Sequence, residues 1–126
     1  MKNRRYGSFR DLKVYQIAYR LAMELFEETK NVPVEEKYSL TDQIRRSTRS
    51  VAANIAEAWK KRRYKKAFVS KLIESSGEAG ETEVWLDVSL DAGYLSKEKH
   101  QYFIERYEEV SRMLFGIVDK PEKFCH

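Results

Sequence analysis

Apolar residues recur every three or four positions in four separate stretches of this chain, which is the period of an α-helix. The stretch from residue 68 to residue 90 is the clearest case, with apolar or small side chains in heptad-like steps. No segment alternates with the period of two that a half-buried strand requires. We therefore predict an all-α fold with helices at about residues 10–31, 39–60, 64–92 and 96–119.

Local signals mark the ends of the first two predicted helices. Ser8 and Asp11 form a capping pair at the start of the first helix, and Pro33 follows its end. Ser39 and Asp42 form a second capping pair, which predicts the start of the second helix.

The last two helices carry similar signals. Gly93 suits the position that stops the third helix, Ser96 caps the fourth, and Pro121 marks its end. Short connections between long helices predict an antiparallel up-down-up-down four-helix bundle. We expect one domain over residues 1–126, with residues 1–8 as a flexible basic tail.

Composition bounds the class of protein. The 126 residues include 35% charged and 42% hydrophobic residues, which is typical of a soluble helical domain. Cys125 stands alone, so no disulfide framework forms within one chain. No apolar run has the length of a signal peptide or a membrane span, and we expect a cytoplasmic protein without membrane contact.

A polar row runs beside the apolar stripe of the second predicted helix. It consists of Arg46, Ser50, Asn54 and Glu57. Either the row is a binding site, extended by Gln43, or it is a buried structural network that fixes helix register. We favour the network, in which Arg46 and Asn54 reach acids of the third helix. These acids are Glu81 and Glu83.

The third predicted helix contains two glycines, Gly77 and Gly80. A glycine inside a helix costs about 1 kcal/mol relative to alanine, so the pair needs a compensating role. Close approach of a neighbouring helix is the usual one. We expect that neighbour to be the alanine row of the second helix, which consists of Ala52, Ala53 and Ala56.

Charge is segregated more sharply than the net value of +4 indicates. Residues 45–71 hold ten Lys or Arg and one acid, whereas residues 74–91 hold six acids and no base. A basic corner of this kind either binds phosphate backbones or meets the acidic stretch of a neighbouring subunit. We favour nucleic acid, and the predicted contacts are Arg45, Arg49, Lys60, Lys61, Arg62, Arg63, Lys65 and Lys66.

Tyr64 lies within the basic run and either stacks on a base or staples the start of the third helix. No RNA-recognition, KH or zinc-finger signature accompanies it, so binding should have weak sequence specificity.

Catalytic motifs are missing from the sequence. The two histidines, His100 and His126, are far apart and have no cysteine or carboxylate at metal-ligand spacing. The glycines of residues 77–80 lie in a predicted helix and lack the Gly-Lys-Ser/Thr of a phosphate loop. We expect a non-catalytic protein without a metal or cofactor.

Three segments of the chain are characteristic of one family. They are residues 9–16 (Phe-Arg-Asp-Leu-Lys-Val-Tyr-Gln), 38–46 (Tyr-Ser-Leu-Thr-Asp-Gln-Ile-Arg-Arg) and 50–57 (Ser-Val-Ala-Ala-Asn-Ile-Ala-Glu). Over residues 9–95 the chain resembles the 23S ribosomal RNA intervening-sequence proteins, which are small bacterial proteins. It differs at Ala58, where the family usually has glycine, and at Glu78, where it usually has serine.

The resemblance implies a four-helix bundle that assembles as a ring-like homopentamer. The accessory proteins of diversity-generating retroelements, a distant branch, form a basic pentamer that binds nucleic acid and a reverse transcriptase. The expected partners are therefore further copies of the chain, RNA or another nucleic acid, and another protein. The alternative function is a structural or protein-interaction scaffold whose charge segregation serves self-assembly.

Overall fold

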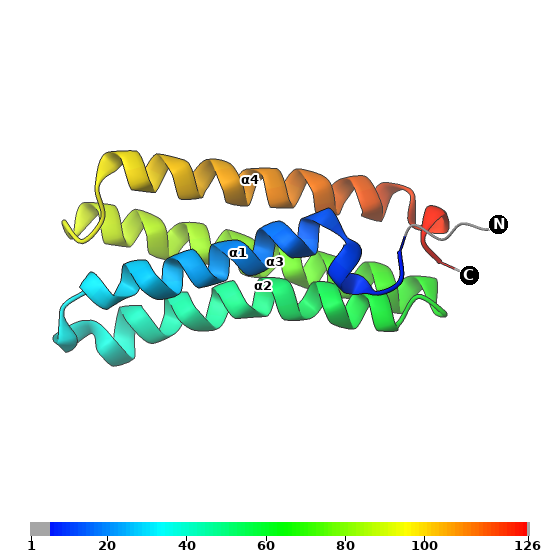
Figure 1. The fold of residues 1–126 in the computed structure, drawn as a ribbon, viewed down its shortest axis with the longest axis horizontal. Helices are drawn as coiled ribbons and strands as arrows, with labels where there is room; N and C mark the ends of the chain where they lie inside the picture. Colours follow the sequence, from blue (N-terminus) through cyan, green and yellow to red (C-terminus); the bar gives the residue numbers. More distant parts are fainter. Residues whose placement is uncertain (1–5, 126) are drawn as a thin grey trace.

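The computed structural model describes residues 6–125, and within that part of the chain it is all-helical. The four long helices are α1 (Lys13–Glu28), α2 (Asp42–Lys60), α3 (Lys65–Asp91) and α4 (Lys97–Asp119). The chain runs back and forth along the long axis of the molecule through these helices (Figure 1). The prediction of an all-α fold with four helices is confirmed.

The first helix is shorter than the predicted span of residues 10–31. Ser8 and Asp11 do form a capping box, but it closes a separate 3₁₀ turn, Phe9–Asp11. The backbone of Leu12 is extended, which interrupts the helix and turns its side chain into the core. A second 3₁₀ turn, Thr29–Asn31, follows α1.

The predicted start of the second helix is wrong by three residues. Residues Lys37–Thr41 form one π-helical turn, and α2 begins only at Asp42. Ser39 does not cap α2, because it lies inside the π-helical turn and Thr41 occupies the position before the helix. The Ser39 hydroxyl instead donates to the carboxylate of Glu36 at 2.6 Å.

The ends of α3 and α4 follow the predicted signals. Gly93 has a φ of +83°, the left-handed conformation that favours glycine after a helix. The N–H of Tyr94 then donates to the carbonyl of Ser89 at 2.8 Å, which completes the helix end. The hydroxyl of Ser96 caps α4 by accepting a hydrogen bond from the N–H of Lys99 at 3.2 Å.

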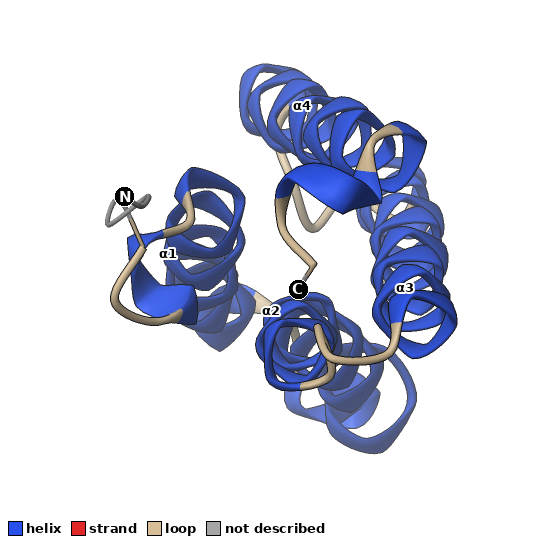
Figure 2. Ribbon diagram, turned by 90° about the vertical axis from the view of Figure 1, so that its right-hand side faces the viewer, coloured by secondary structure: helices blue, strands red, loops and turns tan. Residues whose placement is uncertain are grey.

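Viewed end-on, the helices are arranged around a common core in the order α1, α2, α3, α4 (Figure 2). The most extensive packing is between α2 and α3, and α1 contacts α4 least among adjacent pairs. Polar contacts also cross the seam between α2 and α3. The buried Ser75 hydroxyl donates to the carbonyl of Val51 at 2.7 Å, and Ser47 meets Thr82 in the same seam.

The glycines of α3 do not contact the alanine row, so that prediction is wrong. A Cβ atom added at Gly77 or Gly80 would meet no other atom within 4 Å. The alanines instead face α1, where Ala52, Ala53 and Ala56 line a groove. The seam between α2 and α3 is filled by other side chains, including the hydroxyls of Ser47 and Ser75.

The N-terminal segment is packed where it is described. Residues 1–5 of the predicted flexible tail lie outside the described residues. Tyr6 lies edge-on to the ring of Trp59, with 5.6 Å between ring centroids, and 6.0 Å from the ring of Phe124. Tyr6 therefore contacts both the end of α2 and the C-terminal segment.

Candidate nucleic-acid interface

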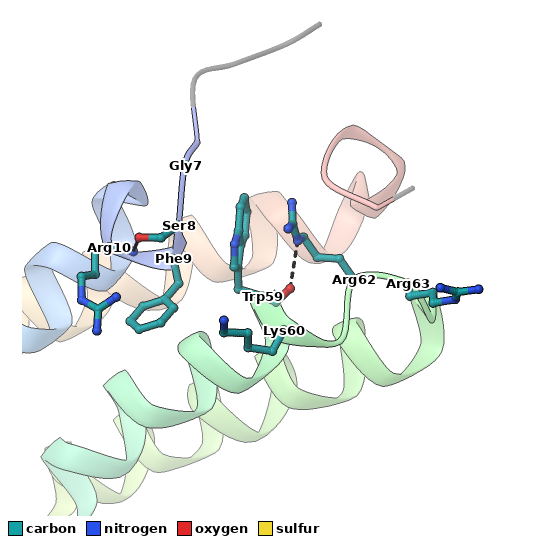
Figure 3. A pocket seen from close by; sticks show the side chains of 8 residues that line it. All are labelled: Gly7, Ser8, Phe9, Arg10, Trp59, Lys60, Arg62 and Arg63. Carbon is teal, nitrogen blue, oxygen red and sulfur yellow. Dashed lines mark hydrogen bonds between the residues drawn. The ribbon is translucent and has the colours of Figure 1, made fainter.

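An open pocket lined by basic side chains lies at the end of the bundle where α2 stops. Its volume is about 810 Å³. Two segments build it, the N-terminal turn and the last turn of α2 with the loop after it (Figure 3). The lining residues are Gly7, Ser8, Phe9, Arg10, Trp59, Lys60, Arg62 and Arg63.

The N-terminal wall of the pocket is held by its own hydrogen bonds. The Ser8 hydroxyl accepts a hydrogen bond from the N–H of Arg10 at 3.1 Å. The Asp11 carboxylate accepts from the N–H groups of Ser8, at 3.1 Å, and Gly7, at 2.6 Å. These bonds fix the 3₁₀ turn that presents Arg10, whose guanidinium lies 4.5 Å from the centre of the Phe9 ring.

The second wall follows from the way α2 ends. The N–H of Lys61 donates to the carbonyl of Ala58 at 2.9 Å, and that of Tyr64 donates to the carbonyl of Lys61 at 2.9 Å. This tight turn holds Lys60 and Arg62 near Trp59, whereas the side chain of Arg63 points away from the other lining residues (Figure 3).

Arg62 is the most constrained cation of the pocket. Its Nε donates to the carbonyl of Trp59 at 2.9 Å, and its guanidinium lies 3.6 Å from the centre of the indole ring. Partial burial lowers the pKa of Arg62, but an arginine remains protonated in proteins. The guanidinium is thus a fixed positive charge at the edge of the pocket.

The two aromatic residues of the pocket already have partners. Trp59 is only 6% exposed, between Arg62 on its face and Tyr6 at 5.6 Å. Phe9 packs edge-on against Tyr15, with 4.9 Å between centroids, and lies beneath Arg10. Trp59 therefore offers no open face on which a base stacks, and Arg10 occupies one face of Phe9. The pocket therefore provides cations, and its aromatic rings orient them.

The positive charge of this pocket is not neutralised within the described part of the chain. No ion pair there joins the pocket cations or the neighbouring lysines to a carboxylate. Lys61, Lys65 and Lys66 are exposed in the loop after α2 and at the start of α3. Tyr64 beside them is 66% exposed, which argues against the interpretation that it staples α3.

Arg45 and Arg49 do not belong to this pocket, although the sequence grouped them with its bases. Arg45 lies fourteen residues before Trp59, which corresponds to about 21 Å along a helix. Its side chain donates to Thr29 Oγ1 at 2.9 Å and to the carbonyl of Phe26 at 3.1 Å, so it holds the end of α1. Arg49 lies 6.0 Å from the centre of the Phe26 ring and lines the groove between α1 and α2.

Sequence reasoning missed Arg10 and Trp59. Arg10 lies next to the segment interpreted as a flexible tail, and Trp59 belongs to the hydrophobic residues of α2. The capping pair of Ser8 and Asp11 signalled an ordered turn. It did not indicate that the turn lies beside the end of α2, because that neighbourhood arises only from tertiary packing.

The polar row of α2 forms a partly exposed network at the rim of the seam with α3, and not the buried network that was expected. The side chain of Arg46 is 47% exposed and pairs with Glu78, at 3.3 Å, and with Glu81. Its Nε also donates to Gln43 at 3.3 Å. The hydrogen bond from Arg46 is the main cause that lowers the pKa of Glu81, and a bond from Trp85 adds to it.

The remaining members of the row are separated from Arg46. The amide of Asn54 is buried and donates only to Ser50, at 3.4 Å, among the described residues. Glu57 pairs with Lys71 at 3.0 Å. Glu83 does not join the network: burial raises its pKa, and the nearby charges are the carboxylates of α3 and α4, from Asp87 and Glu108.

Other classes of site find little support in residues 6–125. No group of three or more His, Cys, Asp or Glu side chains there is arranged to hold a metal ion. None of the helices described has both the length and the apolar character to span a membrane. His100 pairs with Asp87 at 2.7 Å, and burial raises the pKa of the Cys125 thiol.

Comparison with known proteins identifies a family and solved structures of similar fold. The model of the family described as 23S rRNA-intervening sequence protein matches residues 10–116. The chain is also similar to a crystal structure of a protein with unknown function from the S23 ribosomal protein family of Bacteroides thetaiotaomicron. The two are 28% identical, with a TM-score of 0.77, over 85% of this chain and 96% of the other. No curated protein matches the chain.

Proposed function

The chain belongs to the 23S rRNA-intervening sequence protein family, and from this membership we propose that it binds RNA without catalysis, through the basic pocket at the end of α2. The observation that supports this proposal is the set of unpaired cations around one open pocket. Arg10, Lys60, Arg62 and Arg63 line it, and none of them has a carboxylate partner within residues 6–125.

Phosphate groups are the ligands that such a pocket suits best. Arginine and lysine bind phosphate oxygens with charge-assisted hydrogen bonds, and the release of counterions drives association. Because Trp59 is buried and Arg10 lies over the Phe9 ring, we expect base stacking in the pocket to add little. We therefore expect binding with weak base preference and strong salt dependence.

The family name refers to 23S rRNA, which favours RNA over other polyanions as the ligand. The proposal also includes a cytoplasmic location and, as the family resemblance implies, assembly into a homopentamer. Several copies of the pocket on one assembly would raise the effective affinity for a long RNA.

Fluorescence anisotropy with a labelled, unstructured RNA over a series of salt concentrations tests the proposal. The variant Arg10→Gln/Lys60→Gln/Arg63→Gln removes three pocket cations whose side chains reach solvent. If each contacts one phosphate, the slope of log K against log salt falls by about 2, at roughly 0.7 per phosphate of a single strand.

The matched control is Lys30→Gln/Lys37→Gln/Lys97→Gln, which removes the same charge from the opposite end of the bundle (Figure 1). It should leave the slope close to that of the parent protein. Equal slopes for the two triple variants, or no binding at low salt, would overturn the proposal. Cleavage of the RNA during incubation would overturn its non-catalytic part.

A further inference from the structure

The outward side of α3 is apolar, although it faces solvent. Its residues follow helical spacing and consist of Ile73, Gly77, Gly80, Val84 and Val88, which we call the outer face of α3. The three aliphatic side chains are 50%, 52% and 40% exposed. The opposite side of α3 is buried in the core, so this helix carries two apolar stripes with charged residues between them. An apolar stripe on a helix is normally covered, and this chain covers only one of the two.

The two glycines strengthen this observation. Each costs about 1 kcal/mol in a helix relative to alanine, and neither makes the close contact that would offset the cost. They leave a flat strip between Ile73 and Val84, which are eleven residues and about 16 Å apart. A partner that approaches closely would use this strip.

The same chain carries a groove of matching character between α1 and α2. Its volume is about 450 Å³, and its lining is mainly apolar. Small side chains, including those of Ala53 and Ala56, form one side, and aromatic rings such as those of Tyr15 and Tyr19 border it. The full lining is Phe9, Tyr15, Tyr19, Ala22, Met23, Phe26, Arg49, Ala52, Ala53 and Ala56.

The distribution of charge favours the α1–α2 groove over a second α3 helix as the partner of the outer face of α3. Residues 74–91 of α3 carry six acids and no base, so two α3 helices packed on each other would bring like charges together. The only charged residue that lines the groove is a base, Arg49. The groove side of the bundle and α3 also lie on opposite sides in the end-on view (Figure 2), so both surfaces can be used at once.

We infer that the outer face of α3 docks into the α1–α2 groove of a second copy of the chain. The contact is heterologous, meaning that each copy offers a ridge to one neighbour and a groove to the next, and such contacts close into rings when the geometry allows. The inference rests on the self-assembly in the proposed function and names the surfaces that would carry it, whereas it does not depend on RNA binding by the basic pocket. It assigns Arg49 to assembly and not to the nucleic-acid contacts.

Two single variants and their mixture test this arrangement by light scattering coupled to size-exclusion chromatography. Ala53→Trp fills the groove, and Val84→Arg places a charge on the outer face of α3. Both positions are exposed within one chain. Each variant should be monomeric. A 1:1 mixture should form a dimer of one chain of each kind. The Ala53→Trp chain keeps an intact outer face of α3, and the Val84→Arg chain keeps an intact groove to receive it.

Phe115→Arg is the matched control, since Phe115 is 50% exposed on α4. This variant should keep the mass of the parent assembly. Circular dichroism checks that each variant retains its helix content, and Arg49→Glu replaces Ala53→Trp as the groove variant if the latter does not fold.

Four results would overturn the inference. They are a monomeric parent protein, a folded groove variant that keeps the mass of the parent assembly, a folded Val84→Arg variant that keeps that mass, and a mixture of folded variants that remains monomeric. Loss of RNA binding with assembly intact would bear on the proposed function alone.

Discussion

Ser47 Oγ and Thr82 Oγ1 lie 2.8 Å apart in the buried seam between α2 and α3. Both side chains are fully buried, at positions that the helical spacing assigns to apolar stripes. The Thr82 hydroxyl can donate to the carbonyl of Glu78 at 3.0 Å while it accepts from Ser47, whose proton otherwise reaches the carbonyl of Ile44 at 3.3 Å. A hydroxyl pair of this kind satisfies two buried polar groups and disfavours a shift of one helix along the other.

We expect Ser47→Ala and Thr82→Val to be coupled. Each single change should lower the free energy of unfolding by about 1 kcal/mol, because the remaining hydroxyl keeps only its own-helix carbonyl. The double variant should lose less than the sum, with a coupling energy of about 0.5–1 kcal/mol. Urea unfolding of all four proteins measures the cycle, and strict additivity would show that the two hydroxyls do not interact.

Arg46→Gln provides a comparison from the rim of the same seam. The Arg46 ion pairs are half exposed, and pairs of that kind contribute about 0–1 kcal/mol and weaken with salt. Its effect should therefore fade at high salt, whereas the coupling of Ser47 with Thr82 should not.

Replacing Gly77 or Gly93 with alanine should change the stability of the chain in opposite directions. Gly77→Ala meets no atom within 4 Å and removes a flexible residue from α3, so it should stabilise the chain by about 0.5–1 kcal/mol. Gly93→Ala places a side chain at a φ of +83° and should destabilise it by about 1–2 kcal/mol.

The comparison is best made in the Val84→Arg background, where assembly should not contribute to the measured stability. The measured quantity is the free energy of unfolding, obtained from urea denaturation. A destabilising Gly77→Ala would show that α3 is closely packed at that point, contrary to the structure described here.

Glu36 links the two loops at the end of the bundle opposite the basic pocket. Its carboxylate accepts hydrogen bonds from Ser39, at 2.6 Å, and from Tyr94, at 3.0 Å, and these bonds lower its pKa. A lowered pKa means that this stabilisation is present above the ordinary value of about 4.5 and is lost as the pH falls through the folded value. The hydrogen bond to Glu36 also raises the pKa of Tyr94. At alkaline pH, the stabilisation from this bond is therefore lost only above 10.0, the ordinary pKa of tyrosine.

Tyr94→Phe should therefore destabilise the protein at pH 7 and make little difference once Glu36 is protonated. The measurement is the difference in unfolding free energy between variant and parent from pH 7 down to pH 3. Tyr38→Phe is the control, because Tyr38 is largely exposed and makes no such bond among the described residues. A difference that stays constant over this range would contradict the role of Glu36.

The sequence by itself determined the class of the fold and several helix ends. Gly93 and Ser96 were predictable because a left-handed stop and an N-terminal cap depend only on residues within one or two turns. The loop of bases after α2 was equally visible, since a contiguous run of charge needs no tertiary information. Ser39 is the local signal that failed, because the chain is already helical there, in the π-helical turn that precedes α2.

Only the tertiary structure decided which of these parts meet. It brought Arg10 and Trp59 to one pocket, it placed Arg45 at the end of α1 and not in that pocket, and it turned the glycines of α3 toward solvent. Helix periodicity defines faces but not neighbours, because many pairings of faces satisfy the same pattern. The choice among them depends on how the side chains of all four helices fill one core.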